Sequence, residues 1–71
     1  MIDDIRSLLE ADPFRPFSIE TSSNACLEVN SPKQVTIPFH GETIHYHTRD
    51  WELHIIAVRH IIRLTVREGR R

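Results

Sequence analysis

Cysteine is almost missing from this sequence, and its scarcity excludes one large class of small proteins. Cys26 is the one cysteine in 71 residues, so no internal disulfide can form. A secreted scaffold held by disulfides is therefore excluded, and a lone thiol suits a reducing cytoplasm. A chain this short buries only about 60% of its unfolded surface on folding. We expect a single domain, residues 1–71, that gains support from a second copy or a protein partner.

The sequence also has no large excess of either charge and no long apolar run. Nine Lys and Arg residues are balanced by ten Asp and Glu residues, so no broad cationic field attracts nucleic acid or anionic lipid. No apolar run approaches the roughly 18 residues that a membrane span needs. The acidic start Met1-Ile2-Asp3-Asp4 is unlike a signal peptide. We expect a cytoplasmic protein that binds no membrane.

Apolar residues recur at helical spacing early in the chain and at strand spacing afterwards. One stripe at helical spacing contains Ile2, Ile5, Leu8 and Leu9. It predicts a helix over about 3–11 that ends before Pro13. Alternation of apolar and polar residues predicts strands at about 17–22, 25–30, 34–39, 43–48, 52–57 and 61–67, the third to fifth of these forming a meander.

This order of elements predicts a mainly β (α+β) fold. We expect a short N-terminal helix followed by a five-stranded, strongly bent antiparallel sheet, or a small SH3-like or Sm-like barrel, because twisted strands with one buried face tend to close and remove their edges. The Sm-like comparison is the closer one, since Sm proteins also begin with a helix and have a short turn before the last strand. That comparison concerns the order of elements and carries no activity.

Two prolines mark the corner between the helix and the first strand. Pro13 and Pro16 restrict the backbone on either side of Arg15. We expect Phe14 to fill the gap between helix and sheet and Phe17 to begin the inner face of the first strand.

The first turn of the meander is expected at His40-Gly41, which is the right size for a two-residue hairpin loop. This turn places Val35 opposite Tyr46. It also predicts that Ile37 and Phe39 face inward with Val35, because residues two apart on a strand share a face.

A second tight turn, centred near Asp50-Trp51, predicts which side of the next strand is buried. With Thr48 opposite Leu53, both Leu53 and Ile55 face inward and His47 lies across from His54. Residues of the opposite face then form an apolar patch, and the exposed turn adds an aromatic side chain to it. The predicted interface residues are Trp51, Ile56, Val58 and Ile61. Either a partner covers this patch or the N-terminal helix does.

Three of the five histidines are candidates for a metal site. His45 and His47 share a face, and the predicted register brings His54 across from them, so Zn²⁺ or Ni²⁺ could bind. The alternative is an ordinary polar outer face, and we favour it because no fourth ligand is evident. We therefore expect no metal and no other cofactor.

No combination of residues points to catalysis. Cys26 has no base or oxyanion hole placed beside it by the sequence, and Asp50 and Glu52 lie in a turn without an evident pocket. We expect no enzyme activity, and we assign no catalytic or cofactor-binding residues.

Arginines gather at the end of the chain, at positions 59, 63, 67, 70 and 71. With His45, His54 and Trp51 they would suit a surface for single-stranded nucleic acid. A solvated charged edge is the favoured interpretation, because the chain has no net positive charge and lacks a glycine-containing second motif.

The run Ala11-Asp12-Pro13-Phe14-Arg15-Pro16-Phe17, with His60-Ile61-Ile62-Arg63-Leu64 near the end, resembles a family of short, uncharacterised bacterial proteins. The resemblance implies a small β-rich cytoplasmic domain and transfers no activity or site residue. We therefore expect a small non-catalytic protein-interaction or regulatory module that self-associates. The alternative is an Sm-like protein that binds single-stranded RNA. The partner's identity and the pathway are left open.

Overall fold

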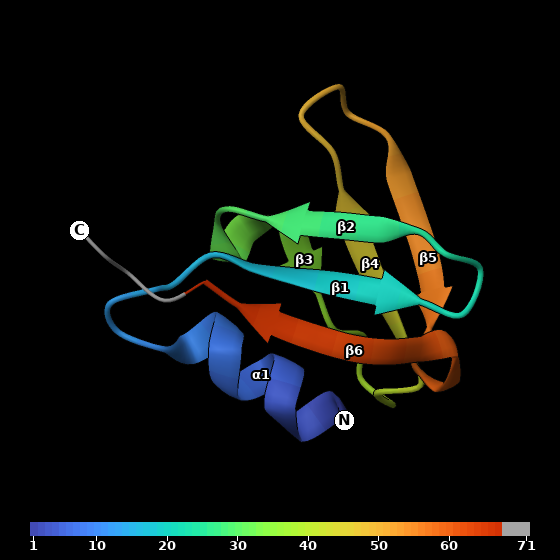
Figure 1. Ribbon diagram of the computed structural model, residues 1–71, viewed down its shortest axis with the longest axis horizontal. Helices are drawn as coiled ribbons and strands as arrows, with labels where there is room; N and C mark the ends of the chain where they lie inside the picture. The colour runs from blue at the N-terminus through green and yellow to red at the C-terminus, as the bar shows by residue number, and fades with distance from the viewer. Residues whose placement is uncertain (68–71) are drawn as a thin grey trace.

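One α-helix, six short strands and two 3-10 turns make up residues 1–67, the part of the chain that the computed structural model describes (Figure 1). In chain order they are α1 (Ile2–Glu10), β1 (Phe17–Thr21), β2 (Cys26–Val29), η1 (Pro32–Gln34), β3 (Val35–Thr36), β4 (Thr43–His47), β5 (Leu53–Ala57), η2 (Val58–His60) and β6 (Ile61–Val66). Within these residues, no helix has the length and apolar character that crossing a membrane requires.

The strands form two antiparallel sheets of three strands each, in the orders β2-β1-β6 and β3-β4-β5. The two sheets face each other, and their strands cross steeply (Figure 1). The prediction of a mostly β fold with one short N-terminal helix is confirmed. The prediction of a single five-stranded sheet is wrong, and the described strands form no closed barrel.

A break after β2 explains why the strands form two sheets rather than one. Gln34 Oε1 accepts hydrogen bonds from the backbone N–H groups of Asn30 (2.6 Å) and Ser31 (3.1 Å), and Ser31 Oγ accepts from Lys33 N–H (3.3 Å). This reciprocal capping box, with Pro32 at the first helical position, folds the chain into η1. The chain therefore leaves the first sheet at η1 and enters the second at β3.

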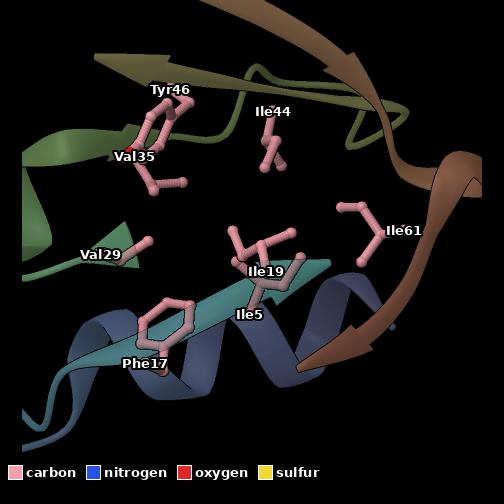
Figure 2. Packing of buried hydrophobic residues seen from close by; sticks show 8 residues of the cluster. All are labelled: Ile5, Phe17, Ile19, Val29, Val35, Ile44, Tyr46 and Ile61. Carbon is pink, nitrogen blue, oxygen red and sulfur yellow. The ribbon is translucent and has the colours of Figure 1, made fainter. Parts of the chain in front are cut away.

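The core lies between the two sheets and the helix. Its buried members come from both sheets and from α1 (Figure 2): Ile5, Phe17, Ile19, Val29, Val35, Ile44, Tyr46 and Ile61. The predicted helical stripe is the buried side of α1, because Ile5 is fully buried and Ile2, Leu8 and Leu9 pack against the core. Nine residues are marginal for an isolated helix, so this packing stabilises α1.

The corner between α1 and β1 contributes to the core as expected. Phe17 is 1% exposed, and Phe14 is partly buried and packs against the core. The two rings lie 6.1 Å apart between centroids, inclined at 56°, which is a favourable arrangement for an aromatic pair. The two side chains therefore tie the end of the helix segment to the first strand.

The turn between β3 and β4 is only partly as predicted. Val35 pairs with Tyr46, in agreement with the predicted register. The carbonyl of Pro38 accepts a hydrogen bond from Gly41 N–H (3.0 Å), and Gly41 has φ 71°, so the chain turns before Phe39 can continue the strand. Phe39 is fully exposed, and the expectation that it faces inward is wrong.

Candidate interaction surface

A three-residue loop joins β4 to β5 and determines which side of β5 faces outward. Thr48 N–H donates to the carbonyl of Glu52 (3.0 Å), and Trp51 N–H donates to the carbonyl of Thr48 (3.2 Å). Thr48 Oγ1 accepts from the N–H groups of Asp50 (3.2 Å) and Glu52 (3.0 Å). Trp51 has φ 68°, so the loop is a β-turn followed by a left-handed residue, a common form of three-residue hairpin loop.

The loop shifts β5 by one residue from the predicted register. His47 pairs with Leu53 and Tyr46 pairs with His54, so the predicted pairing of His47 with His54 is wrong. A shift of one residue exchanges the two faces of a strand. Leu53 and Ile55 therefore face outward, with 52% and 62% of their surfaces exposed.

The four residues predicted at an interface are separated by this shift. Trp51 is 94% exposed at the tip of the hairpin, whereas Ile61 is buried in the core. Ile56 and Val58 are partly buried and pack against the core, so the expectation that they lie on an outer patch is wrong. Of the four, only Trp51 is placed where a partner would meet it.

The outward residues of β5 form the surface that the sequence patterns missed. Leu53 and Ile55 lie on the outer face of the second sheet, across from His47 and His45 on β4, and Trp51 stands at one end. We call Trp51, Leu53 and Ile55 the β5 surface. Thr48 is the residue in the sequence that could have indicated this loop. Ser and Thr hydroxyls favour a turn by accepting a hydrogen bond from the backbone N–H two residues further along the chain.

The β5 strand is also an open edge of its sheet. It is the last strand in the order β3-β4-β5, and the β4–β5 hairpin extends beyond the first sheet (Figure 1). A groove of about 500 Å³ separates β5 from the β1–β2 hairpin. Its walls carry no Lys, Arg, Asp or Glu; they contain Thr21, Ser22, Ser23, Ala25, Leu27, His54, Ile55, Ile56, Ala57 and His60.

The three candidate metal-binding histidines do not share a face. His45 and His47 lie on the outer side of β4, while His54 lies opposite Tyr46 with ring centroids 6.2 Å apart. His54 Nε2 is instead 3.3 Å from Glu52 Oε1. Within residues 1–67, no group of three or more His, Cys, Asp or Glu side chains is placed to hold a metal ion.

Two of the C-terminal arginines are paired with carboxylates. Arg63 Nε lies 3.2 Å from Glu20 Oε1, and an Arg67 guanidinium nitrogen lies 3.0 Å from Glu28 Oε1. Glu20 and Glu28 belong to β1 and β2 of the first sheet, so these pairs hold Arg63 and Arg67 on that sheet. Arg70 and Arg71 lie outside the described residues. The arginines therefore do not form one free cationic surface with Trp51.

Tyr46 occupies one backbone acceptor of the edge strand β2. Its hydroxyl donates to the carbonyl of Glu28 at 2.6 Å. Burial, followed by the nearby Glu28 carboxylate, raises the pKa of Tyr46 above its ordinary value. Cys26 is exposed on the same strand, and no side-chain hydrogen bond within residues 1–67 joins it to a base. The absence of enzyme activity stays a prediction.

No protein-family model, curated protein or solved structure matches this chain. The resemblance of its proline-rich corner to short bacterial proteins stays a prediction. The surface itself therefore carries the functional argument.

Proposed function

We propose that the protein is a small, non-catalytic interaction module of the cytoplasm that associates with itself through the β5 surface. The observation that carries the proposal is an open strand edge whose outward side chains are apolar. Leu53 and Ile55 are each more than half exposed. An edge strand of this kind is a template for pairing with another strand.

The edge of β5 has none of the features that usually prevent such pairing. Natural sheets protect their edges with lysines, prolines, bulges or inward-pointing charges. The five residues from Leu53 to Ala57 include no charged residue and no proline, and their pairing with β4 is uninterrupted. The backbone of β5 is therefore ready to accept a further strand.

Apolar burial supplies a reason for the pairing to be favourable. Full burial of a Leu or Ile side chain is worth about 1.5–3 kcal/mol. In the monomer, Leu53 and Ile55 leave more than half of their surface exposed to water. In a symmetric dimer both copies would bury these side chains, so each copy would contribute a substantial part of this energy. A core formed by so few residues leaves a domain of this size in need of such support.

The test compares two lysine substitutions at exposed apolar positions. Ile55→Lys places a charge in the centre of β5, whereas Phe39→Lys places one in the β3–β4 turn at the other end of the sheet. We expect wild type and Phe39→Lys to form a species heavier than one chain in sedimentation equilibrium. We expect Ile55→Lys to raise its dissociation constant about 10- to 100-fold, or roughly 1.4–2.8 kcal/mol. A wild type that remains monomeric at millimolar concentration overturns the proposal.

A second candidate function is binding of single-stranded RNA by an Sm-like domain. Its support is the order of elements: an N-terminal helix, a 3-10 turn η2 before the last strand, and pairing of that last strand with β1. The exposed Trp51 would offer a surface for base stacking. Binding of labelled single-stranded RNA that weakens steeply with salt would support it; no binding at low salt would remove it.

A further inference from the structure

We infer that the partner at the β5 surface is the β5 strand of a second copy, paired antiparallel about a two-fold axis at Ile55. This inference rests on the proposed self-association and specifies its geometry. It follows from three properties of β5: which backbone groups are free, which register uses all of them, and where the flanking charges lie.

The free backbone groups follow from the hydrogen bonds of the hairpin. Thr48 bonds to Glu52 at one end of the β4–β5 ladder, and Val58 N–H donates to the carbonyl of Glu42 (2.9 Å) at the other end. Hydrogen-bonded pairs alternate along an antiparallel ladder. Even-numbered residues of β5 therefore bond to β4. The odd-numbered residues Leu53, Ile55 and Ala57 direct their N–H and carbonyl groups toward the open edge.

One register uses all of these groups. Pairing about Ile55 places it opposite its own copy and places Leu53 opposite Ala57 of the second copy, at both ends. The three pairs make six backbone hydrogen bonds, whereas a shift of two residues in either direction leaves one residue of β5 without a partner strand. The large Leu53 faces the small Ala57, and two β-branched Ile55 side chains meet at the axis, which is a favourable cross-strand pair.

The flanking residues complement one another in this register. Glu52 precedes β5 and Arg59 lies just after it in η2. In this register Glu52 of one copy lies opposite Val58 of the other, so Arg59 comes one position further on, level with Trp51. The symmetry repeats this arrangement at both ends. None of the ion pairs within residues 1–67 includes Arg59. Trp51 lies at the same end as Glu52, where an arginine side chain can stack on its exposed ring.

Disulfide cross-linking tests the register. In a Cys26→Ser background, Ile55→Cys places two thiols across the axis, where hydrogen-bonded partners have Cα atoms about 5.5 Å apart, within the range of a disulfide. We expect Ile55→Cys to form a covalent dimer. Leu53→Cys alone serves as the matched control, because its two copies would lie about 14 Å apart along the strands. We expect it to cross-link only when mixed with Ala57→Cys.

The outcomes separate this inference from the proposed function. A monomeric wild type refutes both. A wild-type dimer in which Leu53→Cys cross-links with itself as readily as Ile55→Cys does overturns the register alone. Ile62→Lys provides a further control, because Ile62 is 59% exposed on β6. The inference expects Ile62→Lys to leave the dimer intact. Loss of the dimer in this variant would place β6 in the interface, and the two-fold geometry at Ile55 would be wrong.

Discussion

Replacing Trp51 with asparagine is expected to stabilise the monomer, although tryptophan is the larger and more apolar side chain. Trp51 has φ 68°, a left-handed conformation that is unusual for a bulky residue. Such a residue costs about 1–3 kcal/mol. Asparagine occurs in the left-handed conformation several times more often than most other residues, so the substitution is expected to remove part of this cost.

The exposure of Trp51 indicates how little is lost in return. The residue is 94% exposed, so removing the indole forfeits almost no buried apolar surface. Its backbone N–H bond to Thr48 (3.2 Å) does not depend on the side chain. We therefore expect the free energy of unfolding to rise by about 1 kcal/mol, which corresponds to roughly 4–8 °C in melting temperature for a domain of this size. Trp51→Gly gains less, because glycine adds freedom to the unfolded chain.

The measurement is urea unfolding followed by far-ultraviolet circular dichroism, because Trp51 is the one tryptophan of the chain and its fluorescence disappears in the variant. All variants are compared in the Ile55→Lys background, so that association does not contribute. Phe39→Asn is the matched control, since Phe39 is equally exposed and is not among the residues with positive φ. A Trp51→Asn variant that is less stable than its parent, beside an unchanged Phe39→Asn, would refute the argument from strain.

Three further predictions concern stability. Phe17→Ala is expected to lower the free energy of unfolding by about 3–5 kcal/mol in chemical unfolding, because Phe17 is 1% exposed. A decrease below about 1 kcal/mol would show that Phe17 contributes little to the core. Tyr46→Phe is expected to cost about 1–3 kcal/mol, since it leaves the Glu28 carbonyl without its donor. The raised pKa of Tyr46 also means that the folded state retains a proton that the unfolded state releases. The stabilisation from this group is therefore fully present below about pH 10 and decreases above it. The decrease in the free energy of unfolding above about pH 10 should be smaller in Tyr46→Phe. Gln34→Ala is expected to cost about 1–2 kcal/mol in thermal unfolding by removing the acceptor for two N–H groups, and an unchanged melting temperature would contradict this role.

The strained tryptophan bears on the proposed function as well. Trp51 combines a left-handed backbone with an almost fully exposed side chain, so no packing within its own chain offsets the strain. Strained residues occur preferentially at functional sites. The two-fold register supplies a role for Trp51, because it places the indole beside Arg59 of a second copy.

Much of the fold could be predicted because it depends on local patterns. Helical spacing at Ile5 and Leu8 identified the helix, and two-residue alternation at Phe17 and Ile19 identified the first strand. These patterns reflect which side of an element is apolar, and a helix or strand must bury that side wherever it packs. The pairing of Val35 with Tyr46 followed from the same alternation.

The candidate site could not be predicted in the same way, because it depends on one residue of loop length. The pattern Leu53-His54-Ile55-Ile56 has apolar side chains on both faces, so alternation alone does not decide which face is buried. Hydrogen bonds to Thr48 Oγ1 stabilise a loop of three residues in place of the predicted two, and the added residue turns Ile56 toward the core.

The amino-acid sequence by itself determined the class of the protein: a short helix, β-rich remainder, no disulfide and nearly balanced charge. Composition and periodicity are properties of neighbouring residues, so they can be recognised in the sequence alone. Only the tertiary structure decided that the strands divide into two sheets at η1, that Ile61 belongs to the core, and that Leu53 and Ile55 face outward along an open edge. These outcomes depend on hydrogen bonds between residues whose relative positions are set by folding, and a shift of one residue in a strand reverses every side chain it carries.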